Sequence, residues 1–159
     1  MTDFLQAPWQ VELAMAALFA ALAVSVVTDL RSRLILNAVT LPALAVILIC
    51  FTWLGGAGQL VDSLIGVAIC AGPLLLASLR GAVGMGDVKL MAVAGAAAGW
   101  PGALAVLIYV SVAGGVQAVT WLLVARARGL ERPRYVPYGL AIAAGTAAAF
   151  FWAEKLLPG

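Results

Sequence analysis

The chain has 159 residues, of which 65% are hydrophobic and only 10% are charged, and its formal net charge is +2. An ordinary soluble domain carries roughly 25% charged residues, so this composition excludes a water-soluble globular protein. The small net charge and the scattered basic residues also exclude nucleic acid as a partner, because nucleic-acid binding needs a clustered basic surface.

Six apolar runs follow one another along the chain. A helix needs roughly 20 apolar residues to cross a hydrocarbon core of about 30 Å. We therefore predict an all-α polytopic integral membrane protein, in which about six transmembrane helices form one bundle and residues 1–159 form a single domain. The runs cover residues 11–28, 36–54, 60–79, 88–100, 102–125 and 137–157.

Basic residues fall in or beside every second connection between these runs, and by the positive-inside rule those connections are cytoplasmic. Both termini are then expected outside, on the side where Lys155 is the single cation. No basic residue precedes the first run, so we expect this helix to be retained rather than cleaved as a signal. Eight of the nine basic residues follow the pattern: Arg31, Arg33, Arg80, Lys89, Arg126, Arg128, Arg132 and Arg134.

The side chains that commonly bind metals are scarce. The chain has no histidine, and its two cysteines, Cys50 and Cys70, lie inside apolar runs. Thiols in such places are more often small buried hydrophobes than partners in a disulfide or a metal site. We therefore predict no metal and no cofactor.

Two aspartates stand where ionisable groups are costly and therefore informative. Asp29 directly follows the first run and Asp87 directly precedes the fourth, so both are expected at similar depth on the same side. Such a pair suits an acid and base peptidase, in which one carboxylate activates water and the other, protonated, supports the oxyanion. Two structural alternatives stay open: Asp87 caps a helix, and Asp29 pairs with Arg31 or Arg33.

Glycines precede the second aspartate, in Gly84-Met85-Gly86-Asp87. They leave the backbone free to adopt positive φ and allow another segment to approach closely. A simple helix cap does not need two glycines. We therefore expect Gly84 and Gly86 to give this loop the freedom to close on a substrate.

Three ordered motifs resemble those of the type IV prepilin peptidases. Gly84-Met85-Gly86-Asp87 is similar to the GxGD signature of intramembrane-type aspartic proteases, and Lys89 extends it to GxGDxK. Asp29 is followed eight residues later by Asn37, as in that family, and Pro137-Tyr138-Gly139 is similar to the PYG or PFG segment that opens its last helix. The family usually has Ile-Pro-Asn before the second helix, where this chain has Ile35-Leu36-Asn37.

The resemblance implies an aspartic endopeptidase in which Asp29 and Asp87 are catalytic, with Gly84, Gly86 and Lys89 supporting the motif. Asn37 and Tyr138 are possible residues of the substrate cleft, although Lys89 also suits a cytoplasmic anchor, Asn37 a helix cap and Tyr138 the aromatic belt.

The implied substrate is a prepilin or pseudopilin, cut at the cytoplasmic face of the bacterial inner membrane, with membrane lipid and a pilus or type II-like secretion machinery as further partners. The longer family members carry an insertion with paired CxxC motifs linked to N-methyltransferase activity. This chain has no such motif and resembles the short, peptidase-only form found with Flp-type and tight-adherence systems.

Two other classes of function remain compatible with the sequence. In a small proton-coupled transporter, the two aspartates would relay protons or bind a cation, and they would lie near the bilayer midplane. In a non-enzymatic subunit of a secretion machine, the aspartates would only cap helices or pair with arginines, and Asp→Asn changes would preserve function.

Overall fold

The computed structural model describes residues 8–128 and 138–156, with side chains through residue 152. The described residues form four helices and no strand: α1 (Trp9–Ser32), α2 (Asn37–Leu79), α3 (Met85–Ala127) and α4 (Tyr138–Leu156). The all-α prediction is confirmed, but the helix count is four rather than about six. Arg132, Arg134 and Pro137, which took part in the predictions above, lie outside the described residues.

The count differs because α2 and α3 each contain two helical segments joined at a break. Gly56 has φ 64° and ψ −150°, and Gly99 has φ 59° and ψ −171°. Side chains with a Cβ rarely adopt such angles, so glycine allows these breaks. The sequence had indicated connections beside both positions. The described chain therefore has six helical segments within four continuous helices.

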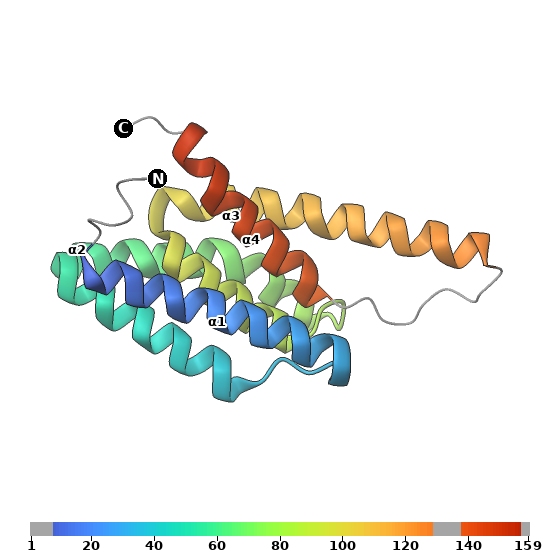
Figure 1. The fold of residues 1–159 in the computed structure, drawn as a ribbon, viewed down its shortest axis with the longest axis horizontal. Coiled ribbons are helices and arrows are strands. Elements are labelled where there is room, and N and C mark those ends of the chain that lie inside the picture. Colours follow the sequence, from blue (N-terminus) through green and yellow to red (C-terminus); the bar gives the residue numbers. More distant parts are fainter. Residues whose placement is uncertain (1–7, 129–137, 157–159) are drawn as a thin grey trace.

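Both long helices turn back at their breaks, as Figure 1 shows. Asp87 and Gly114 are 27 residues apart in α3, which would separate them by roughly 40 Å in a straight helix, yet both line one pocket. In α2, Asn37 bonds Lys89, and Leu74 lines the pocket together with Asp87. The two ends of α2 thus both lie near the start of α3.

Helices α1 and α4 run antiparallel to each other. Asp29, near the end of α1, contacts Gly139 at the start of α4, whereas Phe19 and Phe150 pack edge to face with ring centroids 6.5 Å apart. Trp9 and Leu156 therefore lie toward the same end of the bundle. Asp29 and the start of α4 lie toward the other end.

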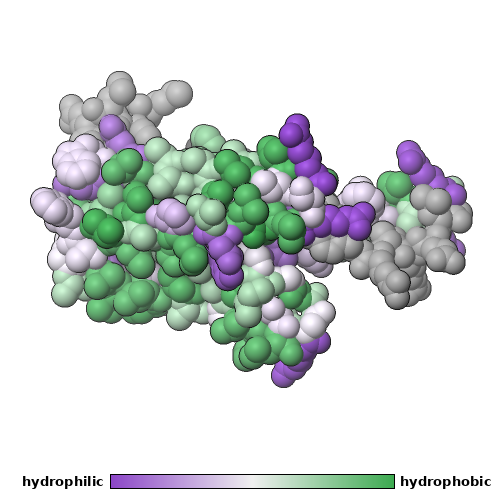
Figure 2. Space-filling model, turned by 90° about the horizontal axis from the view of Figure 1, so that it is seen from below, coloured by the Kyte–Doolittle hydropathy of each residue, from purple (hydrophilic) through white to green (hydrophobic). Residues whose placement is uncertain are grey.

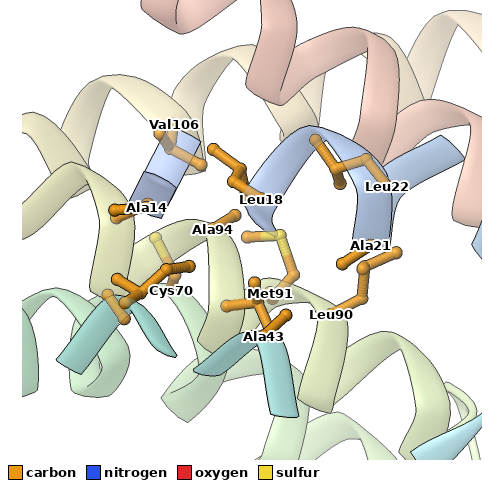
Figure 3. Packing of buried hydrophobic residues seen from close by; sticks show 14 of the residues in the cluster. Ala14, Leu18, Ala21, Leu22, Ala43, Cys70, Leu90, Met91, Ala94 and Val106 are labelled. Carbon is orange, nitrogen blue, oxygen red and sulfur yellow. The ribbon is translucent and has the colours of Figure 1, made fainter. Parts of the chain in front are cut away.

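The interior is built from small and aliphatic side chains contributed by all four helices. Figure 3 shows Leu18 of α1 among Met91 and Ala94 of α3. Gly66 of α2 and Gly95 of α3 cross so closely that a Cβ on either would overlap the carbonyl oxygen of the other. Small residues at helix crossings are typical of packing in lipid, where close backbone approach stabilises the bundle.

The outer surface is apolar. Large hydrophobic side chains such as Trp53, Ile108 and Val116 are more than 60% exposed, and hydrophobic residues cover most of the body in Figure 2. By length and composition, α1, α2 and α3 can each cross a membrane, and α4 contains a shorter apolar stretch over Tyr138–Trp152. This surface and these helices are those of a multi-pass membrane protein, whose orientation stays a prediction.

Candidate active site

Asp29 lies in the last turn of α1 and is only 1% exposed. Its Oδ2 accepts a hydrogen bond from the backbone N–H of Gly139 at 2.9 Å. A Cβ built on Gly139 would stand 2.8 Å from this same oxygen, so only glycine lets the start of α4 approach the carboxylate this closely. The Pro137-Tyr138-Gly139 motif therefore reaches Asp29 through its third residue, Gly139.

Asp87 is the third residue of α3 and is 5% exposed. The N-cap position belongs to Gly84, which has an extended conformation, so the alternative that Asp87 is the N-cap is wrong. The backbone of Gly84 hydrogen-bonds the Asp87 carboxyl group. The other oxygen, Oδ1, is buried without a hydrogen-bond partner among the described residues. A buried polar atom without a partner is uncommon and calls for an explanation.

The two motif glycines do not adopt positive φ. Gly84 has φ −70°, and the described glycines with positive φ are Gly56, Gly81 and Gly99. Gly86 is helical, and a Cβ on it would stand 2.8 Å from the Cβ of Ile35. The expected close approach is thus present at Gly86, but the expected use of positive φ is wrong for both glycines.

Lys89 and Asn37 are bonded to each other. The Nζ of Lys89 donates a hydrogen bond to Oδ1 of Asn37 at 2.7 Å, which joins the first residue of α2 to the second turn of α3. Leu36, rather than Asn37, is the N-cap of α2, so the capping alternative for Asn37 is wrong. The asparagine that follows Asp29 in the sequence motif and the lysine of the GxGDxK motif are therefore in contact, although they belong to separate segments of the chain.

The ends of three helices bring the two aspartates into one region. Asp87 lies within electrostatic range of Asp29, although the two residues are 58 positions apart in the chain. Both are buried, and both stand within the first or last turn of a helix rather than at its middle. Two carboxyl groups placed close together can accept one proton and donate another, as hydrolysis of an amide requires.

A pocket of about 350 Å³ opens beside Asp87. It is lined by the end of α2, both halves of α3 and the start of α4, and it includes Tyr138. Asp29 is not among its lining residues. The pocket therefore stands on one side of the carboxyl pair, with Asp87 in its wall and Tyr138 at its edge.

The comparisons with known proteins decide the family. The family model described as the type IV leader peptidase family matches residues 16–119, which is more than half of the chain. The chain belongs to this family. The match includes both aspartates, Asn37 and the segment from Gly84 to Lys89, whereas Tyr138 lies beyond its end.

A curated relative supports this family assignment. The chain is 32% identical over 145 residues to a protein of Xanthomonas campestris pv. campestris named prepilin leader peptidase/N-methyltransferase. The aligned region covers 82% of this chain and 47% of the relative. The chain thus spans about half the length of the relative it matches. No solved structure matches the family member described here.

Sequence reasoning missed three parts of this candidate site. The contact of Gly139 with Asp29 and that of Ile35 with Gly86 join segments far apart in the chain, and no local pattern marks them. The pocket is also formed only when α3 turns back.

Among the described residues, no group of three or more His, Cys, Asp or Glu side chains could hold a metal ion.

Proposed function

We propose that this protein is a membrane-embedded aspartic endopeptidase that removes the short basic leader from prepilin or pseudopilin substrates. One observation carries the proposal. Two buried aspartates converge from the ends of α1 and α3, and one of them, Asp87, lines a pocket and has a buried carboxyl oxygen without a hydrogen-bond partner among the described residues. Membership of the type IV leader peptidase family supplies the class of substrate.

The chemistry needs one proton on the pair. The ionised carboxylate takes a proton from water while the water oxygen bonds to the scissile carbonyl carbon, and the protonated carboxyl group supports the developing oxyanion. When the intermediate collapses, the carbon–nitrogen bond breaks and the leaving nitrogen takes a proton from the pair. Asp29 and Asp87 act as a coupled unit, so neither is assigned as the acid or the base.

Neighbouring groups would hold the pair in position. The N–H of Gly139 fixes one oxygen of Asp29, and the backbone of Gly84 bonds Asp87. The bond between Lys89 and Asn37 ties α3 to α2 close to Asp87. These four residues, Gly139, Gly84, Lys89 and Asn37, act through the aspartates or the helices that bear them, and so they are positioning residues. Tyr138, at the edge of the pocket, is proposed to contact the substrate.

The proposed setting is the cytoplasmic face of a bacterial inner membrane. The leader would stay in the cytoplasm while the apolar helix of the substrate lies in lipid against the bundle, and both termini of the enzyme would lie outside. The product would enter a pilus or a type II-like secretion machinery. The basic residues Arg31, Arg80 and Arg126 flank the helix ends nearest the aspartates, which favours this orientation under the positive-inside rule.

We propose the peptidase step alone for this chain. The relative is named for both a leader peptidase and an N-methyltransferase, and this chain spans about half of it. Paired CxxC motifs accompany methyltransferase activity in the longer family members that the sequence resembles. The two cysteines here, Cys50 and Cys70, are single and buried in α2.

The rival functions fit less well. A proton-coupled transporter would hold its carboxylates near the middle of membrane-spanning helices, whereas Asp29 and Asp87 stand at helix ends. A purely structural subunit would have no use for an unpartnered carboxylate oxygen beside a pocket, because burying such an atom costs free energy.

The decisive test is cleavage of a prepilin from the same genome, co-expressed with wild type, Asp29→Asn or Asp87→Asn and measured by mass spectrometry. Asp62→Asn is the matched control, because Asp62 lies beside Gly99 at the break in α3 rather than near the pair. All four proteins must reach the membrane in equal amounts. Cleavage by wild type and Asp62→Asn alone supports the proposal, and cleavage by either site variant refutes it.

A further inference from the structure

The pocket beside Asp87 continues from the carboxyl group into the apolar part of the bundle. Met91 and Ile142 belong to its lining, and each lies four residues, or one helical turn, after Asp87 and Tyr138 respectively. Leu107 and Val110 of the second half of α3 complete this deeper part. Of the described residues that line the pocket, Asp87 is the one charged side chain. The pocket therefore suits an apolar group placed next to a polar bond.

Its volume decides how much it can hold. A cavity of about 150 Å³ lined by apolar side chains accommodates one benzene molecule. The present pocket, at about 350 Å³, has room for one large side chain together with part of the backbone that bears it. It is too large for a single water and large enough for the apolar part of a peptide.

Small residues of α3 keep this space open. Gly114, Gly115 and Ala118 form one wall, and a Cβ added at Gly115 would meet no heavy atom within 4 Å. At Gly114 an added Cβ would be in ordinary contact with the ring of Tyr138, at 3.6 Å. Larger side chains on this wall would therefore project into the pocket rather than clash with the backbone.

We propose that this pocket is the subsite for the apolar side chain that follows the cleaved bond, on the membrane-embedded side of the substrate, and that Gly115 and Ala118 set the size it accepts. The inference rests on the proposed function, since it takes Asp87 as one of the two carboxyl groups at the cleaved bond. The leader side of the bond then extends away from the pocket, toward the helix ends.

The unpartnered oxygen of Asp87 favours a peptide over a lipid chain as the occupant. Oδ1 is buried and lacks a hydrogen-bond partner among the described residues, and such an atom gains most from a donor. A peptide backbone beside the pocket brings N–H groups, whereas an acyl chain brings none. An apolar side chain on that peptide would at the same time fill the space lined by Met91 and Leu107.

The test varies one residue of the substrate and one wall of the pocket. Full-length enzyme in membranes is given prepilins with alanine, leucine or tryptophan directly after the cleaved bond, and kcat/KM is measured for each. The enzymes are wild type, Ala118→Leu and Gly115→Leu, and the control is Val119→Leu. Val119 neighbours Ala118 in α3 but is 56% exposed and does not line the pocket.

We expect each pocket variant to lower kcat/KM for the leucine and tryptophan substrates by at least about 10-fold, since apolar pockets discriminate by roughly that factor for one or two carbon atoms. Cleavage of the alanine substrate should change less than about 2-fold, and Val119→Leu should alter none of the three. Two variants are used so that a folding defect in one does not decide the outcome.

Three other results overturn the inference. Equal slowing of all three substrates would mean that the pocket acts on activity generally, as an occupying lipid chain would. No slowing of any would mean that the substrate does not enter the pocket. In both cases wild-type cleavage leaves the proposed function standing. If wild type cuts none of the substrates, the proposed function fails and the subsite falls with it.

Discussion

The Nζ of Lys89 lies 2.7 Å from Oδ1 of Asn37 and donates a hydrogen bond to it. Lys89 lies in α3, two residues after Asp87. Asn37 is the first residue of α2, which follows α1 and its Asp29 after a short connection. The bond therefore ties together the two segments of chain that bear the aspartates. Its function should be visible both in stability and in cleavage.

A double-mutant cycle with Lys89→Met and Asn37→Leu tests this coupling. Each single change should lower the free energy of unfolding by about 1 kcal/mol, a normal value for one hydrogen bond at a partly exposed position, and should slow cleavage several-fold. The double variant should be no worse than either single one, because both remove the same bond. Thermal unfolding in detergent and initial cleavage rates give the two readouts, and strictly additive losses would contradict the coupling.

If the protein is the proposed peptidase, Gly139→Ala should strongly lower prepilin cleavage with little effect on folding. The new Cβ would stand 2.8 Å from Oδ2 of Asp29, so the carboxylate must move, and small displacements of a reacting group cost on the order of 100-fold in rate. The measurement is the rate of prepilin cleavage at equal membrane content.

Gly58→Ala is the control for this substitution, because a Cβ at Gly58 meets no atom within 4 Å. This variant should cleave like wild type and be as stable or slightly more so, by up to about 1 kcal/mol, since alanine favours the helix. Full activity in Gly139→Ala would show that the contact of α4 with Asp29 has no part in the reaction.

The helices and the candidate aspartates could be predicted from sequence because their signals are local. Apolar runs mark the spans, Gly56 and Gly99 lie at the breaks, and Asp87 follows a short motif. The contacts could not be predicted, because they join distant segments: Asp29 meets Gly139 across 110 positions. The helix count also differed, because the breaks at Gly56 and Gly99 are too short to end a helix.

The role expected for Gly86 changed for a related reason. Sequence shows that a residue lacks a side chain but not which demand this meets, positive φ or close approach. At Gly86 the requirement is for space, because a Cβ on this residue would stand 2.8 Å from the Cβ of Ile35 in the α1–α2 connection. That contact brings the segment after Asp29 against the first turn of α3.

A size swap at this contact gives the third prediction. Gly86→Ala should lower cleavage at least about 10-fold, and Gly86→Val more, because the added Cβ would approach that of Ile35 to 2.8 Å and push the first turn of α3 away. Adding Ile35→Gly to Gly86→Ala removes the opposing atom and should restore part of the activity. Ile35→Gly alone controls for the loss of the isoleucine. Retention of full activity by Gly86→Val would rule out a positional role for this glycine.

The crossing of Gly66 and Gly95 should determine stability rather than chemistry. A Cβ on Gly95 would overlap the carbonyl oxygen of Gly66 and stand 2.8 Å from Cβ of Cys70, and backbone atoms cannot move aside as a flexible side chain can. Gly95→Ala should therefore separate the second half of α2 from the first half of α3 and destabilise the bundle by roughly 1–3 kcal/mol. Thermal inactivation in detergent measures the loss. Gly102→Ala, in the same helix, is the control, because its Cβ would be in ordinary contact with Ala98 at 3.5 Å. This variant should have the same inactivation temperature as wild type. Equal inactivation temperatures for Gly95→Ala and Gly102→Ala would mean that the two helices do not depend on this close approach.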